Sequence, residues 1–114
     1  MYGGSRENRM RFALEIADAL RENWPASKPI LFRLSCIDRF EGGLEIEDTI
    51  ELAKELKNRG VDAIDCSSGG IKGPNSLFSL ATKSPPTPGF QVPLSEAVRH
   101  GAEMATMAVG MIMD

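Results

Sequence analysis

The sequence predicts an α/β fold in which about three parallel strands alternate with three helices. Two observations predict it. Helix-like and strand-like segments alternate in the order helix, strand, helix, strand, helix, strand, and each helix returns to the next strand through a short connection. Such repeated strand–helix–strand units build a parallel sheet with right-handed crossovers, either an open doubly wound sheet or part of a barrel.

The first helix is expected over residues 6–24. Ser5 is a suitable N-cap, and Pro25 ends the helix. The apolar residues recur at spacings of three and four, which places them on one helical face: Met10, Ala13, Leu14, Ala17, Leu20 and Trp24. This pattern indicates an amphipathic helix.

The first strand is expected within residues 29–36, PILFRLSC, a short apolar segment interrupted by Arg33. The pattern is typical of a strand covered on both faces. A buried guanidinium needs an anionic or hydrogen-bonding partner to offset its desolvation. Arg33 therefore has two interpretations: a structural ion pair with a carboxylate such as Asp65 on the adjacent strand, or contact with an anionic or electron-rich ligand.

The second helix is expected over residues 45–60. Ile46, Ile50, Ala53 and Leu56 form its apolar stripe. Acidic residues in its first turn and basic residues in its last agree with the helix macrodipole, and Gly60 is a suitable C-terminal stop. The second strand, VDAIDCS, follows directly at residues 61–67.

Residues 68–92 are rich in Gly, Pro, Ser and Thr and are expected to form a loop far longer than an ordinary strand-to-helix connection. Loops of this length are usually functional or disordered. A short helix is expected next, over residues 93–103, with Pro93 at an early helical position. An apolar third strand, MATMAVGMIMD, is expected over residues 104–114.

Composition and charge disfavour several classes of function. The chain has 114 residues, 42% of them hydrophobic and 25% charged, which is typical of a soluble globular domain. A net charge of −3 with dispersed Lys and Arg disfavours nucleic acid and anionic membranes as partners. We find no apolar run of membrane-spanning length and no signal peptide, so the cytoplasm is the expected location.

Metal-binding and disulfide patterns are absent from the sequence. Cys36, Cys66 and the single histidine, His100, have no zinc-ligand spacing and form no disulfide framework. Each cysteine falls near the end of an expected strand, where a small thiol commonly packs. The alternative is a redox pair, which requires the two strands to be neighbours.

Candidate ligand-binding residues cluster where the expected strands end, because parallel α/β sheets bind ligands at the carboxyl ends of their strands. These candidates are Arg33, Ser35 and Asp38; Asp65, Ser67, Ser68, Gly69 and Gly70; and Gly110 and Asp114. The alternative is that the polar residues only cap turns. The segment GGIKGP lacks the dinucleotide and phosphate-loop spacings, so a phosphate nest there is a weaker hypothesis. His100 is expected to be a solvated helix residue.

Three segments together resemble one family. They are YGGSRENRMRF at residues 2–12, the run from LFRLSC to DCSSGG at residues 31–70, and PGFQVPLSEAVRHGAEMATMAVGMIMD at residues 88–114. The sequence is similar to the old yellow enzymes, which are FMN-dependent NAD(P)H oxidoreductases and ene-reductases built on a (β/α)8 barrel. The resemblance implies a partial (β/α)8 TIM barrel and covers essentially the whole chain.

The resemblance also implies roles for three residues. Arg33 matches the arginine that reaches the N1/O2 edge of the flavin, where its charge stabilises the reduced ring. Ser67 and Gly110 match positions that line the ribityl and phosphate side of FMN. NAD(P)H is the implied reductant, and the implied acceptors are activated alkenes. No catalytic residue and no metal ligand is expected within this chain.

The matched order of elements implies that residues 1–114 are one section of a single barrel domain, from its fourth helix through its seventh strand. The residues that hold the substrate and the tyrosine proton donor have no counterparts here, and Tyr2 is not that tyrosine. We therefore expect the 114 residues alone to be inactive. The exposed apolar surface of such a section favours a homo-oligomer. The alternatives are a stand-alone half-barrel that serves as a binding or assembly module, and a phosphate-binding α/β domain.

Overall fold

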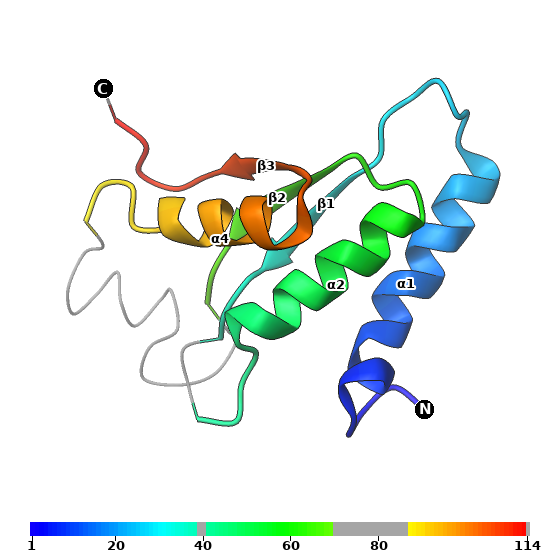
Figure 1. Ribbon diagram of the computed structural model, residues 1–114, viewed down its shortest axis with the longest axis horizontal. Coiled ribbons are helices and arrows are strands. Elements are labelled where there is room, and N and C mark those ends of the chain that lie inside the picture. Colours follow the sequence, from blue (N-terminus) through cyan, green and yellow to red (C-terminus); the bar gives the residue numbers. More distant parts are fainter. Residues whose placement is uncertain (39–40, 70–86, 114) are drawn as a thin grey trace.

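The computed structural model describes residues 1–38, 41–69 and 87–113 (Figure 1). The elements follow the predicted alternation of helix and strand. In chain order they are α1 (Arg6–Asn23), β1 (Leu31–Ser35), α2 (Ile46–Asn58), β2 (Ala63–Ser67), α4 (Val92–Ala102) and β3 (Ala105–Ala108). The chain is therefore an α/β protein, as predicted.

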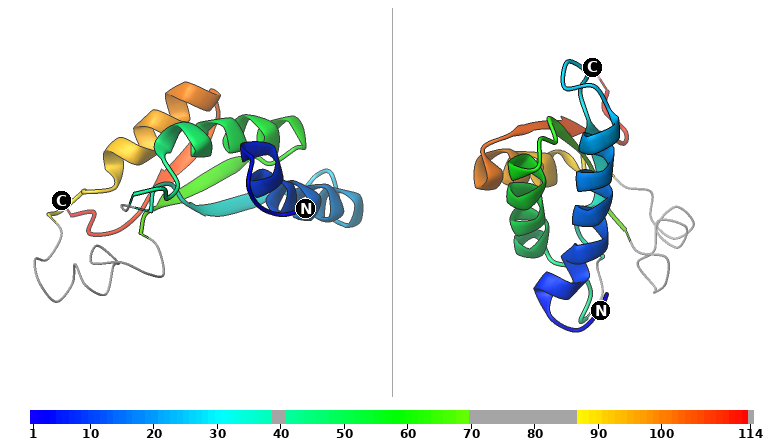
Figure 2. Two further views of the ribbon diagram at one scale, coloured as in Figure 1. Left: turned by 90° about the horizontal axis from the view of Figure 1, so that it is seen from below. Right: turned by 90° about the vertical axis from the view of Figure 1, so that its right-hand side faces the viewer.

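The three strands form one parallel sheet in the order β1-β2-β3. Leu31 pairs with Ala63 and Arg33 with Asp65 between the first two strands, and Asp65 pairs with Met107 between the second and third. Figure 2 shows α2 and α4 on one side of this sheet, with α1 at its margin. Sequential parallel strands with helices on a single face are the arrangement of a partial (β/α)8 barrel.

The core lies between the sheet and its helices. Side chains alternate along a strand, so Ile64 and Cys66 of β2 face α2 and α4 and are fully buried. Ala53 and Leu56 of α2 and Val98 of α4 fill the space opposite them.

The other face of the sheet is open in the part of the chain that the structure describes. Leu31 is 50% exposed, Met107 is 37% exposed, and the Arg33 side chain is 64% exposed. The expectation of a first strand covered on both faces was therefore wrong for this chain, because the described helices cover only one face. Arg33 is correspondingly not buried.

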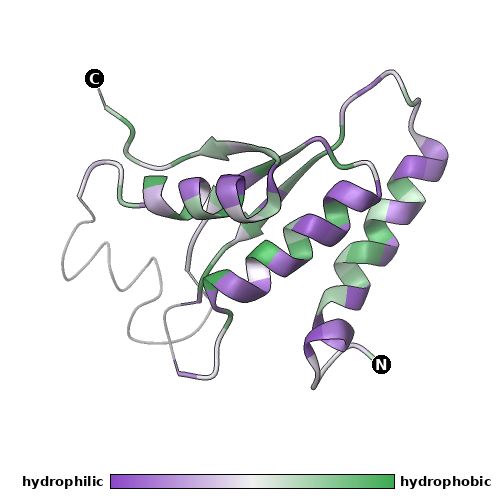
Figure 3. Cartoon of the chain, viewed as in Figure 1, coloured by the Kyte–Doolittle hydropathy of each residue, from purple (hydrophilic) through white to green (hydrophobic). Residues whose placement is uncertain are grey.

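Helix α1 begins as predicted, with the Ser5 side chain accepting a hydrogen bond from the Asn8 backbone N–H at 3.4 Å. The helix packs beside α2 at the margin of the fold (Figure 1). Figure 3 shows hydrophobic residues along it, yet of the predicted apolar face only Ala17 is fully buried, whereas Leu20 and Trp24 are 42% and 45% exposed. The amphipathic pattern is present, but little of the described chain covers it.

The second helix ends near the predicted stop. Its last turn is closed by Gly60, whose φ of +83° is unstrained only for glycine, and the Gly60 N–H donates to the Lys57 carbonyl at 3.0 Å. Helix α4 has its proline in the first turn, also as predicted.

The third strand is shorter than predicted. It spans Ala105–Ala108 rather than residues 104–114, because Gly110 and Met111 both have positive φ values, +87° and +50°, and extended strand geometry cannot pass through them. None of the described helices is long and apolar enough to cross a membrane.

Asp48 links α1 to the first turn of α2. Its Oδ1 lies 2.7 Å from Arg6 Nε and 3.8 Å from Arg9 Nη2, and its Oδ2 accepts from the Glu45 backbone N–H at 3.4 Å. Burial of Asp48 opposes ionisation, but the Glu45 hydrogen bond and the two arginines outweigh it, so the pKa of Asp48 lies below its ordinary value.

We expect Asp48→Asn to lower the free energy of unfolding by about 1 kcal/mol near neutral pH, because it removes charged hydrogen bonds between the helices. A carboxylate with a lowered folded pKa stabilises the fold above its unfolded pKa of about 3.9, and this contribution is lost as pH falls through the folded pKa. The difference between the variants should therefore vanish in acid. Urea unfolding across this pH range measures it, with the exposed Glu47→Gln as the control for charge in the first turn. An equal loss in both variants would contradict the link to α1.

Candidate functional site

The chain segments that follow β1 and β2 are joined at the carboxyl end of the sheet. The Cys36 N–H donates to the Ser67 carbonyl at 2.8 Å, and the Gly69 N–H donates to the Ile37 carbonyl at 2.9 Å. The Ser35 hydroxyl donates to the Gly69 carbonyl at 2.8 Å. These bonds extend the parallel ladder beyond both strands and fix the Ser67–Gly69 turn.

Gln91, which precedes α4, ties this turn to the segment after β3. Its Oε1 accepts from the Ser68 hydroxyl at 2.8 Å and from the Ser67 hydroxyl at 3.5 Å, while its Nε2 donates to the Val109 carbonyl at 2.7 Å. The side chain is almost completely buried, with 3% of Gln91 exposed. The structure thus brings Ser67 and Gly110, both predicted site residues, to the same end of the sheet.

Gly110 lies directly against this amide. A Cβ atom at Gly110 would be 2.5 Å from Gln91 Nε2, closer than side-chain contacts occur, and its φ of +87° also favours glycine. The Gly89 N–H donates to the Met111 carbonyl at 2.9 Å and holds the chain on the other side of this turn. The closeness of Gln91 explains why this position has no side chain.

Arg33 and Asp65 lie next to each other on the open face of the sheet. Arg33 Nη1 is 3.4 Å from Asp65 Oδ2, so the ion pair considered as one interpretation is present. The guanidinium is nevertheless largely exposed, and an exposed ion pair contributes only about 0–1 kcal/mol. Asp65 Oδ1 is buried and has no hydrogen-bond partner within the described residues. The Arg33–Asp65 ion pair stabilises the fold only slightly, so it does not by itself explain why a charged residue stands in the middle of a strand.

Two further candidates have structural roles in the described residues. Asp38 Oδ2 accepts from the Leu44 N–H at 2.8 Å, and the Asp38 N–H donates back to the Leu44 carbonyl at 3.0 Å. This reciprocal pair closes the connection into α2. Ser35 is engaged by Gly69, as described above. Gly70, Asp114, the part of GGIKGP that follows Gly69, and residues 70–86 of the predicted loop lie outside the described residues.

Both cysteines are fully buried on the helix-covered side of the sheet, and their thiols are free. A hydrogen bond with the Cys66 thiol, together with burial, raises the pKa of the Cys36 thiol far above its ordinary value, so this thiol stays protonated. The two strands are neighbours, as the redox alternative required, but the thiols are packed in the core. The packing interpretation is therefore confirmed.

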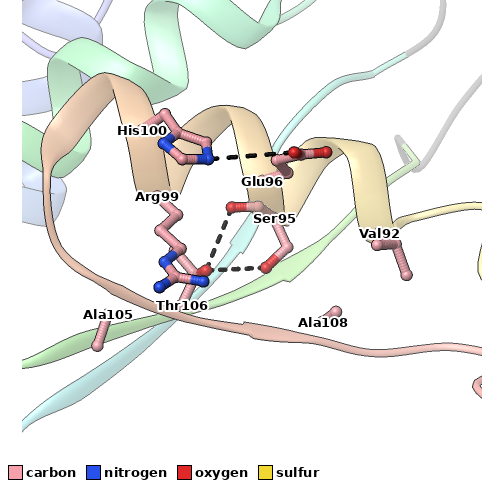
Figure 4. A pocket seen from close by; sticks show the side chains of 8 residues that line it. All are labelled: Val92, Ser95, Glu96, Arg99, His100, Ala105, Thr106 and Ala108. Carbon is pink, nitrogen blue, oxygen red and sulfur yellow. Dashed lines mark hydrogen bonds and ion pairs between the residues drawn. The ribbon is translucent and has the colours of Figure 1, made fainter.

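An open groove runs between α4 and β3, along the edge of β3 that has no neighbouring strand in the described sheet (Figure 4). Ser95 points toward Thr106, whose hydroxyl accepts from it at 2.9 Å, and this contact holds the helix to the strand. Glu96 and His100 also line the groove, and the His100 side chain, 4.0 Å from Glu96, is 75% exposed, as expected of a solvated residue. None of the three predicted cofactor-binding residues lines this groove.

Gln91 is the residue that sequence reasoning missed. A polar residue between Phe90 and Val92 in PGFQVP was available as a signal. Its role depends on contacts with residues 18 to 24 positions away, which local patterning does not reveal.

Sequential parallel strands, helices on one face and polar residues collected at the carboxyl ends are the features of a section of a (β/α)8 barrel. Comparison with known proteins identifies it further. The sequence model of the NADH:flavin oxidoreductase / NADH oxidase family matches residues 1–114, and the chain belongs to this family.

Bacterial relatives of this chain are NADPH dehydrogenases. The proteins from Halalkalibacterium halodurans and Bacillus subtilis are each 45% identical to it, over 111 and 114 residues, and the protein from Geobacillus sp. is 44% identical over 111 residues. These matches cover 97–99% of this chain. The chain spans about 30% of the length of each of these relatives, so it corresponds to a portion of an oxidoreductase.

Proposed function

We propose that this chain forms part of the cofactor site of an FMN-dependent NAD(P)H oxidoreductase of the old yellow enzyme type. The observation that carries the proposal is the placement of Arg33 on the open sheet face, in the middle of the strand next to that of Ser67, with Ser67 and Gly110 together at the carboxyl end of the sheet. Bound FMN supplies hydride-transfer chemistry, with NAD(P)H as reductant and activated alkenes or related acceptors as substrates.

The residues present fit one side of such a group. The Arg33 guanidinium is exposed and can donate to the electron-rich N1/O2 edge of an isoalloxazine. Its positive charge there stabilises the reduced ring. Ser67 offers a hydroxyl, and the Gly110 backbone lies at the same carboxyl end of the sheet, where both can face the ribityl and phosphate side. The role of this chain is to bind and tune the cofactor.

The groups that hold the substrate and deliver the proton are not among the residues assigned here. We therefore propose that the 114 residues alone are catalytically inactive and correspond to the fourth helix through the seventh strand of the barrel. The exposed apolar residues Leu31 and Met107, together with Met111, Ile112 and Met113, support self-association. The cytoplasm is the proposed location, with neither nucleic acid nor membrane as partner.

Titration of the purified chain with FMN tests the proposal, with flavin fluorescence and absorbance as readouts and light scattering for the mass. We expect saturable binding that is lost in Arg33→Ala, because the guanidinium contacts the flavin directly. Lys28→Ala is the control, since it removes a cation that contacts the Trp24 ring far from this site. Equal FMN binding by wild type and Arg33→Ala would contradict the assignment of Arg33.

The same titration separates the alternatives. Simple phosphate esters that bind in preference to FMN would favour a phosphate-binding domain. Self-association without any FMN binding would favour an assembly module or a structural section of a flavoenzyme.

A further inference from the structure

The backbone of Gln91 is fixed by hydrogen bonds, as its side chain is. The Gln91 carbonyl accepts from the Leu94 and Ser95 N–H groups at 3.1 and 3.2 Å, which are the first bonds of α4. The side-chain amide therefore projects from the end of a helix whose position is fixed by the Ser95–Thr106 contact. A side chain placed in this way can hold the Ser67–Gly69 turn and the Val109–Gly110 segment at a constant separation.

The chemistry of the contact requires an amide. Gln91 Oε1 accepts two hydroxyl hydrogen bonds, whereas Nε2 donates to a carbonyl that can only accept. A carboxylate of the same shape would keep the acceptor but would place negative charge against the Val109 carbonyl. Glutamate is therefore a nearly isosteric substitution that breaks one half of the contact.

We propose that Gln91 is a positioning residue that fixes Ser67 and Gly110 relative to each other, so that both contact one bound FMN. This inference rests on the proposed function, since it takes FMN as the shared ligand. Gln91 itself acts through the Ser67–Gly69 turn and the Val109–Gly110 segment. Its removal should therefore weaken FMN binding without removing any group that contacts the cofactor.

FMN titration of Gln91→Glu is the first test. We expect the dissociation constant to rise by about tenfold or more, the equivalent of losing one hydrogen bond that orders the site. Glu96→Gln is the matched control, because it exchanges the same two side-chain types at an exposed position of α4 whose carboxylate faces His100, and it should bind FMN as wild type does. Unchanged affinity in Gln91→Glu overturns the proposal.

Hydrogen exchange of the chain without FMN is the second test. The Gly69 N–H lies in the Ser67–Gly69 turn, and the Gly89 N–H donates to the Met111 carbonyl, next to Gly110. Both amides should exchange about tenfold faster in Gln91→Glu than in wild type or Glu96→Gln. Unchanged exchange overturns the proposal whether or not FMN binds. If wild type shows no FMN binding while the exchange rates respond as expected, the proposed function fails and the linkage of the two segments by Gln91 stands.

Discussion

Replacing Gly101 with leucine is expected to lower the free energy of unfolding by about 2–3 kcal/mol, because the substitution overpacks the contact between two helices. Gly101 lies in α4 where this helix crosses α2. A Cβ atom there would be 2.8 Å from Ile50 Cγ2 and 2.9 Å from Ile50 Cδ1. The branched isoleucine side chain has few rotamers with which to make room, so the helices must separate.

Urea unfolding measures this loss, and His100→Leu is the control because its side chain is exposed on the same helix. The control should change the free energy of unfolding by less than about 0.5 kcal/mol, as surface substitutions usually do. Adding Ile50→Ala to Gly101→Leu should recover part of the loss by freeing space. A loss of the same size in His100→Leu would show that leucine disturbs the helix itself and not its packing on α2.

The order of the elements could be predicted because it depends on local patterns. The 3.6-residue spacing of apolar residues in α2 and the glycine and proline residues at the helix ends encode the elements directly. Parallel pairing then follows from the alternation of strand and helix. The boundaries were right to within a few residues, apart from β3, whose end is set by the backbone conformation of Gly110 and Met111.

The covering of each face could not be predicted from the same patterns. The apolar run around Arg33 indicates a strand shielded on both sides, yet within the described residues one side is open. The apolar pattern records the surroundings for which the strand is suited, and the described residues supply those surroundings on one side only. The chain spans about 30% of the length of its relatives.

The candidate site was predictable only in part. Arg33 stands out because a charged residue interrupts an apolar strand, and Ser67 and Gly110 were assigned through the resemblance of their motifs. The contacts that organise these residues are non-local, since Gln91 reaches Val109 across 18 positions and Ser68 across 23. Such a partnership has no periodicity, so only the folded chain reveals it.

Gly110→Ala is expected to lower the free energy of unfolding by about 2 kcal/mol through two separable effects. The positive φ costs an alanine about 1 kcal/mol. Its Cβ must also displace the Gln91 amide 2.5 Å away, and loss of the bond to the Val109 carbonyl costs about 1 kcal/mol more. Gly42→Ala is the matched control, because Gly42 has a φ of +75° with no atom within 4 Å of its Cβ position. It should show the backbone cost alone.

A double-mutant cycle with Gln91→Ala isolates the steric effect, measured by urea unfolding of the two single variants and the double variant. Once the amide is gone, Gly110→Ala should cost no more than Gly42→Ala, so the two changes should be less than additive by about 1 kcal/mol. The shared dependence arises because both substitutions break the same contact between the Ser67–Gly69 turn and the segment after β3. Full additivity, or equal losses in Gly110→Ala and Gly42→Ala, would mean that displacing the Gln91 amide costs no free energy. Gly110 would then be required for its backbone conformation alone.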